Sequence, residues 1–208
     1  PDVDVDYYVR QLKNMTAEVK GKFTNNDNDA AKLKTLISYL FEENGYHGSR
    51  QDYYNKANSY MNRVLDDREG LPITLSVLVM ELATECGIDG VVGVGAPGHF
   101  IIKHVIDEKE QFIDPFDSGK YLSQADTEEL VRANTGRSFV PEYLVKSNKR
   151  DIVLRMLRNL MGAAQESNQP AELLRYVETL VALQPDSAFD RWSRAVLLIQ
   201  NRQFGAAK

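Results

Sequence analysis

His99 and Asp114 are the two residues of this sequence whose types and spacing best suit catalysis. His99 precedes the apolar run FIIKHVI, and Asp114 ends the run QFID directly before a proline. A carboxylate that orients an imidazole lets histidine act as a general base, and acyl-transfer sites add a nucleophile such as a thiolate at a helix N-terminus. The pair therefore indicates a triad whose nucleophile must come from another element.

Thr74 carries the hydroxyl nearest to the start of the apolar helix predicted upstream of His99. A threonine inside a chain lacks the terminal amine that activates familiar threonine nucleophiles, and its hydroxyl commonly bonds to the backbone instead. Cys86 is the single thiol and lies further along the same helix, roughly 18 Å from Thr74 at 1.5 Å per residue. We expect Cys86 to be buried and slow to react, so the candidate catalytic positions are His99, Asp114 and Thr74.

Simpler structural roles exist for each histidine and for the aspartate. His99 could be a strand-end residue that is hydrogen-bonded to a neighbour, and Asp114 could be a turn residue, because Asp-Pro often starts a turn. His104 lies an odd number of residues from His99, which places it on the opposite face of the predicted strand. There we expect it to be exposed to solvent or packed on a helix, rather than to act as a second ligand.

The residues would be positioned by a buried helix followed by a small sheet. Pro72 suits a first helical turn and Gly87 a C-cap, and the helix between them is apolar on most of its circumference, which predicts the central buried helix. Short runs rich in Val, Ile and Phe follow, with a charged turn at 107–110, and these predict an antiparallel hairpin. Its two strands should bring His99 and Asp114 to similar heights.

Further helical patterns flank these elements, so the predicted fold class is α+β. Amphipathic spacing occurs at 6–22, 33–41 and 60–65, and a shorter helix at about 127–133 has Ser123 or Asp126 as its N-cap. A linker at about 136–144 precedes a segment with a helical pattern from Asn148 onward. We therefore expect two domains, 1–145 and 146–208.

The second predicted domain has a loose internal repeat. Offsetting NQPAELLRYVETL against NRQFGAAK by 34 residues aligns Pro170 with Phe204 and Leu173 with Ala207, and Pro185 closes the first unit. A helical pair of this period resembles tetratricopeptide repeats. One repeat and a fragment truncated at Lys208 should pack on the first domain or continue in further sequence.

The first domain resembles the transglutaminase-like, papain-type fold, in which a helix start, a strand start and a following strand end supply Cys, His and Asp. More closely, the segments NRVLDDREGLPITLSVLVMELATECGI, VGAPGHFIIK, FIDPFDSGKYLS and NKRDIVLRMLRNL are similar to the SirB family of bacterial proteins, and related segments occur in some F-box proteins. The resemblance covers nearly the whole chain. It implies a transglutaminase-like domain followed by tetratricopeptide-like helices.

The nucleophile is where this sequence departs from that pattern. Counting the Gly-x-Cys step from Gly70 reaches Pro72, and the hydroxyls of Thr74 and Ser76 follow. None of these is a thiol.

Composition excludes several classes of function. The net charge of -5, with basic residues scattered among acids, excludes a general nucleic-acid binder. Three histidines without a metal-binding run predict no metal, and GVGAPG leads into a strand rather than a helix, so we expect no phosphate-binding loop and no cofactor. The absence of a long apolar run and of a basic leader predicts no membrane span and no signal peptide, and a single cysteine fits the cytoplasm.

Two functions remain, of which the first is favoured. The chain could be a non-catalytic interaction module that binds a protein or peptide partner through its helical repeat and cleft. Alternatively, it could be a hydrolase or acyltransferase in which His99 and Asp114 activate a hydroxyl or water.

Overall fold

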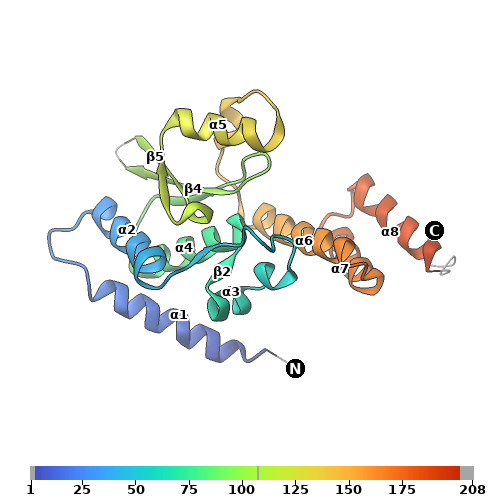
Figure 1. Cartoon of the computed structure of the whole chain (residues 1–208), viewed down its shortest axis with the longest axis horizontal. Coiled ribbons are helices and arrows are strands. Elements are labelled where there is room, and N and C mark those ends of the chain that lie inside the picture. Colours follow the sequence, from blue (N-terminus) through green and yellow to red (C-terminus); the bar gives the residue numbers. More distant parts are fainter. Residues whose placement is uncertain (1–2, 107, 202–208) are drawn as a thin grey trace.

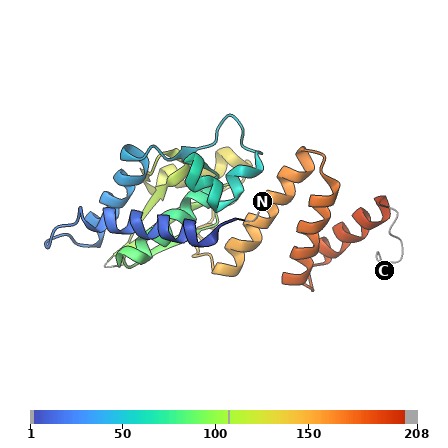
Figure 2. The same cartoon turned by 90° about the horizontal axis from the view of Figure 1, so that it is seen from below.

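A small antiparallel sheet packs on helices on both of its faces, and three further helices extend to one side (Figures 1 and 2). The computed structural model describes residues 3–106 and 108–201. The helices are α1 (Val5–Lys20), α2 (Asp29–Ser38), α3 (Met61–Asp67), α4 (Pro72–Cys86), α5 (Gln124–Thr135), α6 (Lys149–Glu166), α7 (Pro170–Leu183) and α8 (Ala188–Gln200). The strands are β1 (His47–Gly48), β2 (Glu69–Gly70), β3 (Val91–Val94), β4 (Ile101–Ile106), β5 (Lys109–Asp114) and β6 (Lys120–Leu122).

Helix α4 is the central element, as its apolar circumference predicts. It begins with Pro72 in the first turn and ends at Gly87, which adopts the left-handed conformation at φ 70° that glycine tolerates best. Leu75, Leu78 and Leu82 are each 1% exposed or less and belong to the largest core cluster, which α1 and α2 also line. Because α4 is held on several sides, the position of its N-terminus is fixed relative to the sheet.

The four-stranded sheet has the order β3-β4-β5-β6 with antiparallel neighbours. The predicted hairpin is present: Ile102 pairs with Ile113, and both point into the core around α4. Ile101 and Phe112 point to the other face, beneath α5. One residue of the predicted turn, Asp107, lies outside the described residues. Strands β1, β2 and β6 were not predicted.

The sequence predicted that His104 is either exposed to solvent or packed on a helix, and the structure excludes exposure, because His104 is 3% exposed. It lies on the face of β4 that carries Ile102, and its Nε2 donates to the carbonyl oxygen of Asp89 at 3.0 Å. Burial lowers the pKa of His104, and the hydrogen bond to Asp89 and the nearby charge of Asp29 offset only part of that effect.

We therefore expect His104 to make the protein less stable in acid. A folded-state pKa below the unfolded value means that the fold favours the neutral imidazole, so this contribution to stability is complete above the ordinary histidine pKa of about 6.5 and is lost as the pH falls below it. The difference in the free energy of unfolding between the wild type and His104→Gln, measured with urea, should change between pH 8 and pH 5. His47→Gln, at an exposed histidine, is the control. A difference that is the same at both pH values for His104→Gln contradicts the expectation.

Helix α7 packs on α6 and α8 packs on α7, and the three helices form an arm beside the sheet (Figure 2). The arm is attached to the rest of the chain by apolar and polar contacts. Ile152 of α6 packs in a buried cluster with Leu71 and Phe100. The hydroxyls of Tyr60 and Tyr176 are 2.6 Å apart, and Lys56 Nζ lies 3.1 Å from Glu172 Oε1. The backbone amide of Ser147 also donates to Gly93 of the sheet at 2.9 Å. The division at 145/146 stays a prediction, and the aligned positions Phe204 and Ala207 lie outside the described residues.

An ion pair between Arg158 and Asp190 joins α6 to α8. Their two hydrogen bonds measure 2.8 and 3.0 Å, and Asp190 is 1% exposed. Because a buried charge-assisted pair leaves an unpaired group when one partner is removed, we expect Asp190→Asn to lower the free energy of unfolding by about 2 kcal/mol. Urea unfolding checks this against Asp186→Asn, at an exposed aspartate nearby. An equal effect of both substitutions contradicts it.

Candidate functional site

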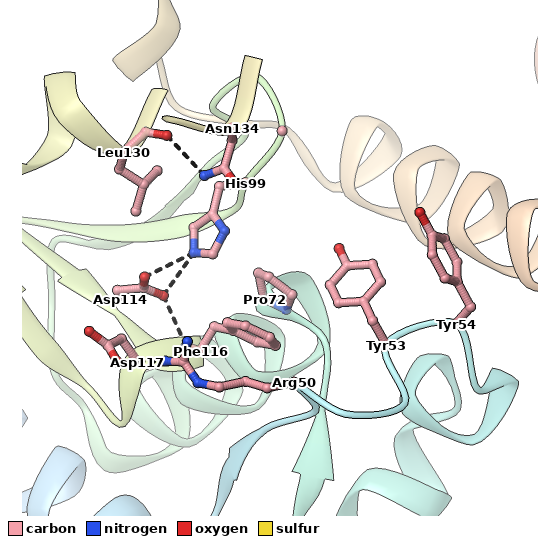
Figure 3. A pocket seen from close by; sticks show the side chains of 11 residues that line it. Arg50, Tyr53, Tyr54, Pro72, His99, Asp114, Phe116, Asp117, Leu130 and Asn134 are labelled. Carbon is pink, nitrogen blue, oxygen red and sulfur yellow. Dashed lines mark hydrogen bonds and ion pairs between the residues drawn. The ribbon is translucent and has the colours of Figure 1, made fainter. Parts of the chain in front are cut away.

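His99 and Asp114 form a hydrogen-bonded pair, as the hairpin predicts. Nε2 of His99 lies 3.0 and 2.9 Å from the two carboxylate oxygens of Asp114, and the residues are 9% and 3% exposed. A carboxylate only accepts hydrogen bonds, so Nε2 is the donor. In the neutral imidazole Nδ1 is then the acceptor, and Figure 3 shows this nitrogen on the side of the ring away from Asp114.

Local backbone geometry explains why both side chains meet. The sequence indicated that His99 opens strand β4. It lies instead in the turn before that strand, where its amide donates to the carbonyl oxygen of Ala96 at 3.1 Å. Gly98 makes that turn at φ 73°, in the left-handed region that glycine tolerates best. Asp114 ends β5, and its Oδ1 caps the 3-10 turn η3 (Pro115–Asp117) by accepting from the amide of Phe116 at 2.9 Å. One carboxylate thus fixes both the turn and the imidazole.

The pair lies in an open pocket of about 610 Å³ (Figure 3). Phe116 contacts both the imidazole of His99 and the ring of Tyr53 edge-on, with centroids 5.9 and 6.1 Å apart. At the rim, Arg50 lies over Phe116 and pairs with Asp117 at 2.6 Å. Burial raises the pKa of Tyr53, although the nearby Arg155 opposes this. The pocket therefore has aromatic walls and a polar rim.

Pro72 is the first residue of α4, and it lines this pocket beside His99. Thr74 does not join the pair. It is 0% exposed, its hydroxyl donates to the carbonyl oxygen of Asn58 at 2.9 Å, and it accepts from the amide of Leu71 at 2.9 Å. Two residues correspond to about 200° around a helix, which turns Thr74 away from the side occupied by Pro72.

The remaining hydroxyl and thiol of α4 are also away from His99. Ser76 is buried and donates to the carbonyl oxygen of Pro72 at 2.7 Å. Cys86, at the other end of the helix, is 7% exposed, and burial raises the pKa of its thiol. The described part of the pocket wall therefore contains no cysteine, serine or threonine beside His99.

A sequence profile decides which family this architecture represents. The profile of the transglutaminase-like superfamily matches residues 6–158, which extend from α1 into α6. The chain belongs to the transglutaminase-like superfamily. The match includes the start of α4, the turn of His99 and the end of β5. The expectation drawn from the order of these elements is thereby confirmed at the level of the superfamily.

Curated relatives of this transglutaminase-like chain come from bacteria and animals. A UPF0162 protein of Xylella fastidiosa is 30% identical over 199 residues, which cover 92% of this chain and 70% of the relative. A UPF0162 protein of Pasteurella multocida is 25% identical over 172 residues, covering 82% and 64%. Human F-box only protein 21 is 29% identical over 183 residues, which are 83% of this chain but 27% of that protein. No solved structure is significantly similar to the chain.

Metal-binding clusters and membrane-spanning helices are absent from the part of the chain that the structure describes. There, no group of three or more His, Cys, Asp and Glu side chains is arranged to hold a metal ion. None of the helices within these residues combines the length and apolar character needed to cross a bilayer.

Several pocket residues carry no signal in the sequence. Tyr53 and Tyr54 lie in the loop after β1, to which no spacing in the sequence assigns a role. Phe116 and Asn134, which line the pocket, were not singled out at all, and neither was Arg155, which holds the turn of His99. They come from η3, α5 and α6, and no spacing rule relates them to His99.

Proposed function

We propose that this transglutaminase-like chain is a non-catalytic protein-interaction module that receives a peptide segment of a partner in the pocket of His99 and Asp114. The main support for this proposal is the residue at the start of α4. Pro72, which has no nucleophilic atom, lines the pocket where the superfamily pattern has its cysteine. The engaged hydroxyl of Thr74 supports the same conclusion.

The helical arm forms the second part of the proposal. We infer that α6, α7 and α8 are a tetratricopeptide-like segment that extends the binding surface and that the chain is of the SirB type. The successive packing of the three helices supports this inference. The proposed setting is the cytoplasm, with a protein or peptide as partner and with neither nucleic acid nor membrane.

A hydrolysis assay tests the absence of catalysis. The full chain and its His99→Ala variant should hydrolyse 4-nitrophenyl acetate at the same rate, because no cysteine, serine or threonine among the described residues lines the pocket to form an acyl-enzyme intermediate. Cys86→Ala removes the background from the only thiol. A saturable rate that falls in His99→Ala would overturn the proposal.

A photo-crosslinker placed at Tyr54, 58% exposed at the pocket, tests the binding role. We expect a partner adduct in cells that is lost when Phe116→Ala removes an aromatic wall. The control position is Val105, which is 38% exposed on the hairpin. Equal adducts at both positions, or an adduct that survives Phe116→Ala, would contradict peptide binding in the pocket.

A hydrolase that activates water is the second candidate, and one observation favours it. Asp114 orients His99 as a base, and Nδ1 is free to accept a proton. In such a reaction Nδ1 takes a proton from water, the hydroxide attacks an acyl carbon, and the imidazolium returns the proton to the leaving oxygen or nitrogen. The ester assay decides between the two candidates.

A further inference from the structure

A second cavity lies beside the His99 pocket, between α6 and the loop that carries Tyr53 and Tyr54. Its volume is about 300 Å³, and Arg155 and Asn159 contribute from α6. In Figure 3 the two tyrosines lie on the side of the His99 pocket that faces α6. A narrow space of about 20 Å³ is lined by Tyr53, His99 and Arg155, each of which also lines one or both of the two cavities.

Arg155 is a half-buried cation without an acidic partner among the described residues. Its Nη2 donates to the carbonyl oxygens of Ala96 and His99 at 3.1 and 2.7 Å, and its guanidinium lies 5.5 Å from the ring centre of Phe100. Burial lowers the pKa of Arg155. A guanidinium has five N–H donors, so the two carbonyl bonds leave donors on Nη1 and Nε available. Burying such a charge without a counter-charge is costly.

The lining of the second cavity favours an anion. Among the described residues, those that line it include no aspartate or glutamate. Arg158 also lines it, but its charge is already paired with Asp190. Ser59 supplies an independent indication: it is 3% exposed, and its buried hydroxyl has no hydrogen-bond partner among the described residues. A buried hydroxyl without a protein partner in a cavity wall indicates a place where a polar ligand group can bind.

We propose that this cavity binds a carboxylate group, held by Arg155 with Ser59 beside it, on a ligand whose body extends along Tyr53 toward His99. A carboxylate is preferred over a phosphate because a single unpaired guanidinium matches one negative charge. The proposal rests on the proposed function in one respect, since it takes the cleft to be a ligand-binding site. It adds the chemical class of the ligand and the residue that recognises it.

Calorimetric titration of the full chain with hippurate and with its neutral amide, hippuramide, tests the proposal. Hippurate offers one carboxylate and one aromatic ring, and we expect it to bind at least 10-fold more tightly than the amide, about 1.4 kcal/mol. The preference should disappear in Arg155→Met. Arg63→Met is the matched control, because Arg63 lies on α3 and pairs with Asp67 at 2.9 Å, and it should keep the full preference.

Arg155 also holds the turn of His99, so a second variant separates recognition from a displaced turn. Ser59 makes no contact with that turn through its hydroxyl, and Ser59→Ala should weaken hippurate severalfold while leaving hippuramide unchanged. Equal binding of acid and amide to the wild type, or hippurate affinity unaffected by both variants, overturns the proposal. Inorganic phosphate that binds more tightly than hippurate also overturns it.

Two sources of carboxylate are distinguished by a further pair of probes. Acetyl-Gly-Gly-Phe with a free C-terminus should bind more tightly than hippurate if the natural ligand is a peptide C-terminus, and no more tightly if it is a small acid. Either result supports the carboxylate site, provided that the peptide with a free C-terminus binds more tightly than the corresponding peptide amide. If the amide binds equally well and the crosslink at Tyr54 persists, the carboxylate site is wrong and the interaction module stands.

Discussion

Pro72→Cys is expected to create a reactive thiol, whereas Thr74→Cys is not. Position 72 lines the pocket beside His99 at the N-terminus of α4, and a thiolate there is stabilised by the helix dipole and by an imidazolium. At pH 6 we expect iodoacetamide to modify Pro72→Cys at least about 10-fold faster than the same variant carrying His99→Ala, since a low thiol pKa requires the neighbouring cation. The measurement is the pH dependence of alkylation, followed by mass spectrometry.

Controls for this experiment come from the same helix. All variants carry Cys86→Ala, so that the introduced thiol is the only one. Thr74→Cys should stay unmodified over the same period, because position 74 is 0% exposed. Identical pH profiles with and without His99, or faster reaction at position 74, would show that the pocket is unrelated to a cysteine-type triad.

Gly48→Ala is expected to lower the free energy of unfolding by about 3 kcal/mol, at the upper end of the usual cost of overpacking. Gly48 of β1 packs directly against the turn that follows Asp114. A Cβ added to Gly48 would overlap the ring of Phe116 and would lie 2.5 Å from the carbonyl oxygen of the same residue. Backbone atoms cannot rotate away as a flexible side chain can, so the turn itself must move.

Gly162→Ala is the matched control for this substitution. Nothing lies within 4 Å of a Cβ built on Gly162, which is inside α6, so alanine should stabilise the protein by about 0.5–1 kcal/mol through its higher helix propensity. Urea unfolding measures both variants. A loss below about 1 kcal/mol in Gly48→Ala would mean that the turn carrying Asp114 yields easily and is not held by β1.

The sequence by itself determined the elements that local signals specify. Helix α4 begins and ends where Pro72 and Gly87 indicate, because a missing amide and a left-handed cap act within one turn of the chain. The hairpin of β4 and β5 follows from short runs rich in Val, Ile and Phe that are joined by a charged turn. Since two strands joined by a short turn must pair, the contact between His99 and Asp114 could be predicted as well.

Only the tertiary structure decided which atoms face that pair. A residue's direction around α4 changes by about 100° per position, and the packing of the helix against α1, α2 and the sheet sets the absolute orientation. That packing turns Pro72 toward His99 and buries Thr74, so the hydroxyl that residue type alone suggested does not face the pair. Arg155 follows His99 by 56 residues, and strands β1 and β2 have two residues each. Neither a distant contact nor so short a strand produces a periodic pattern, because both are specified by packing between segments far apart in the chain.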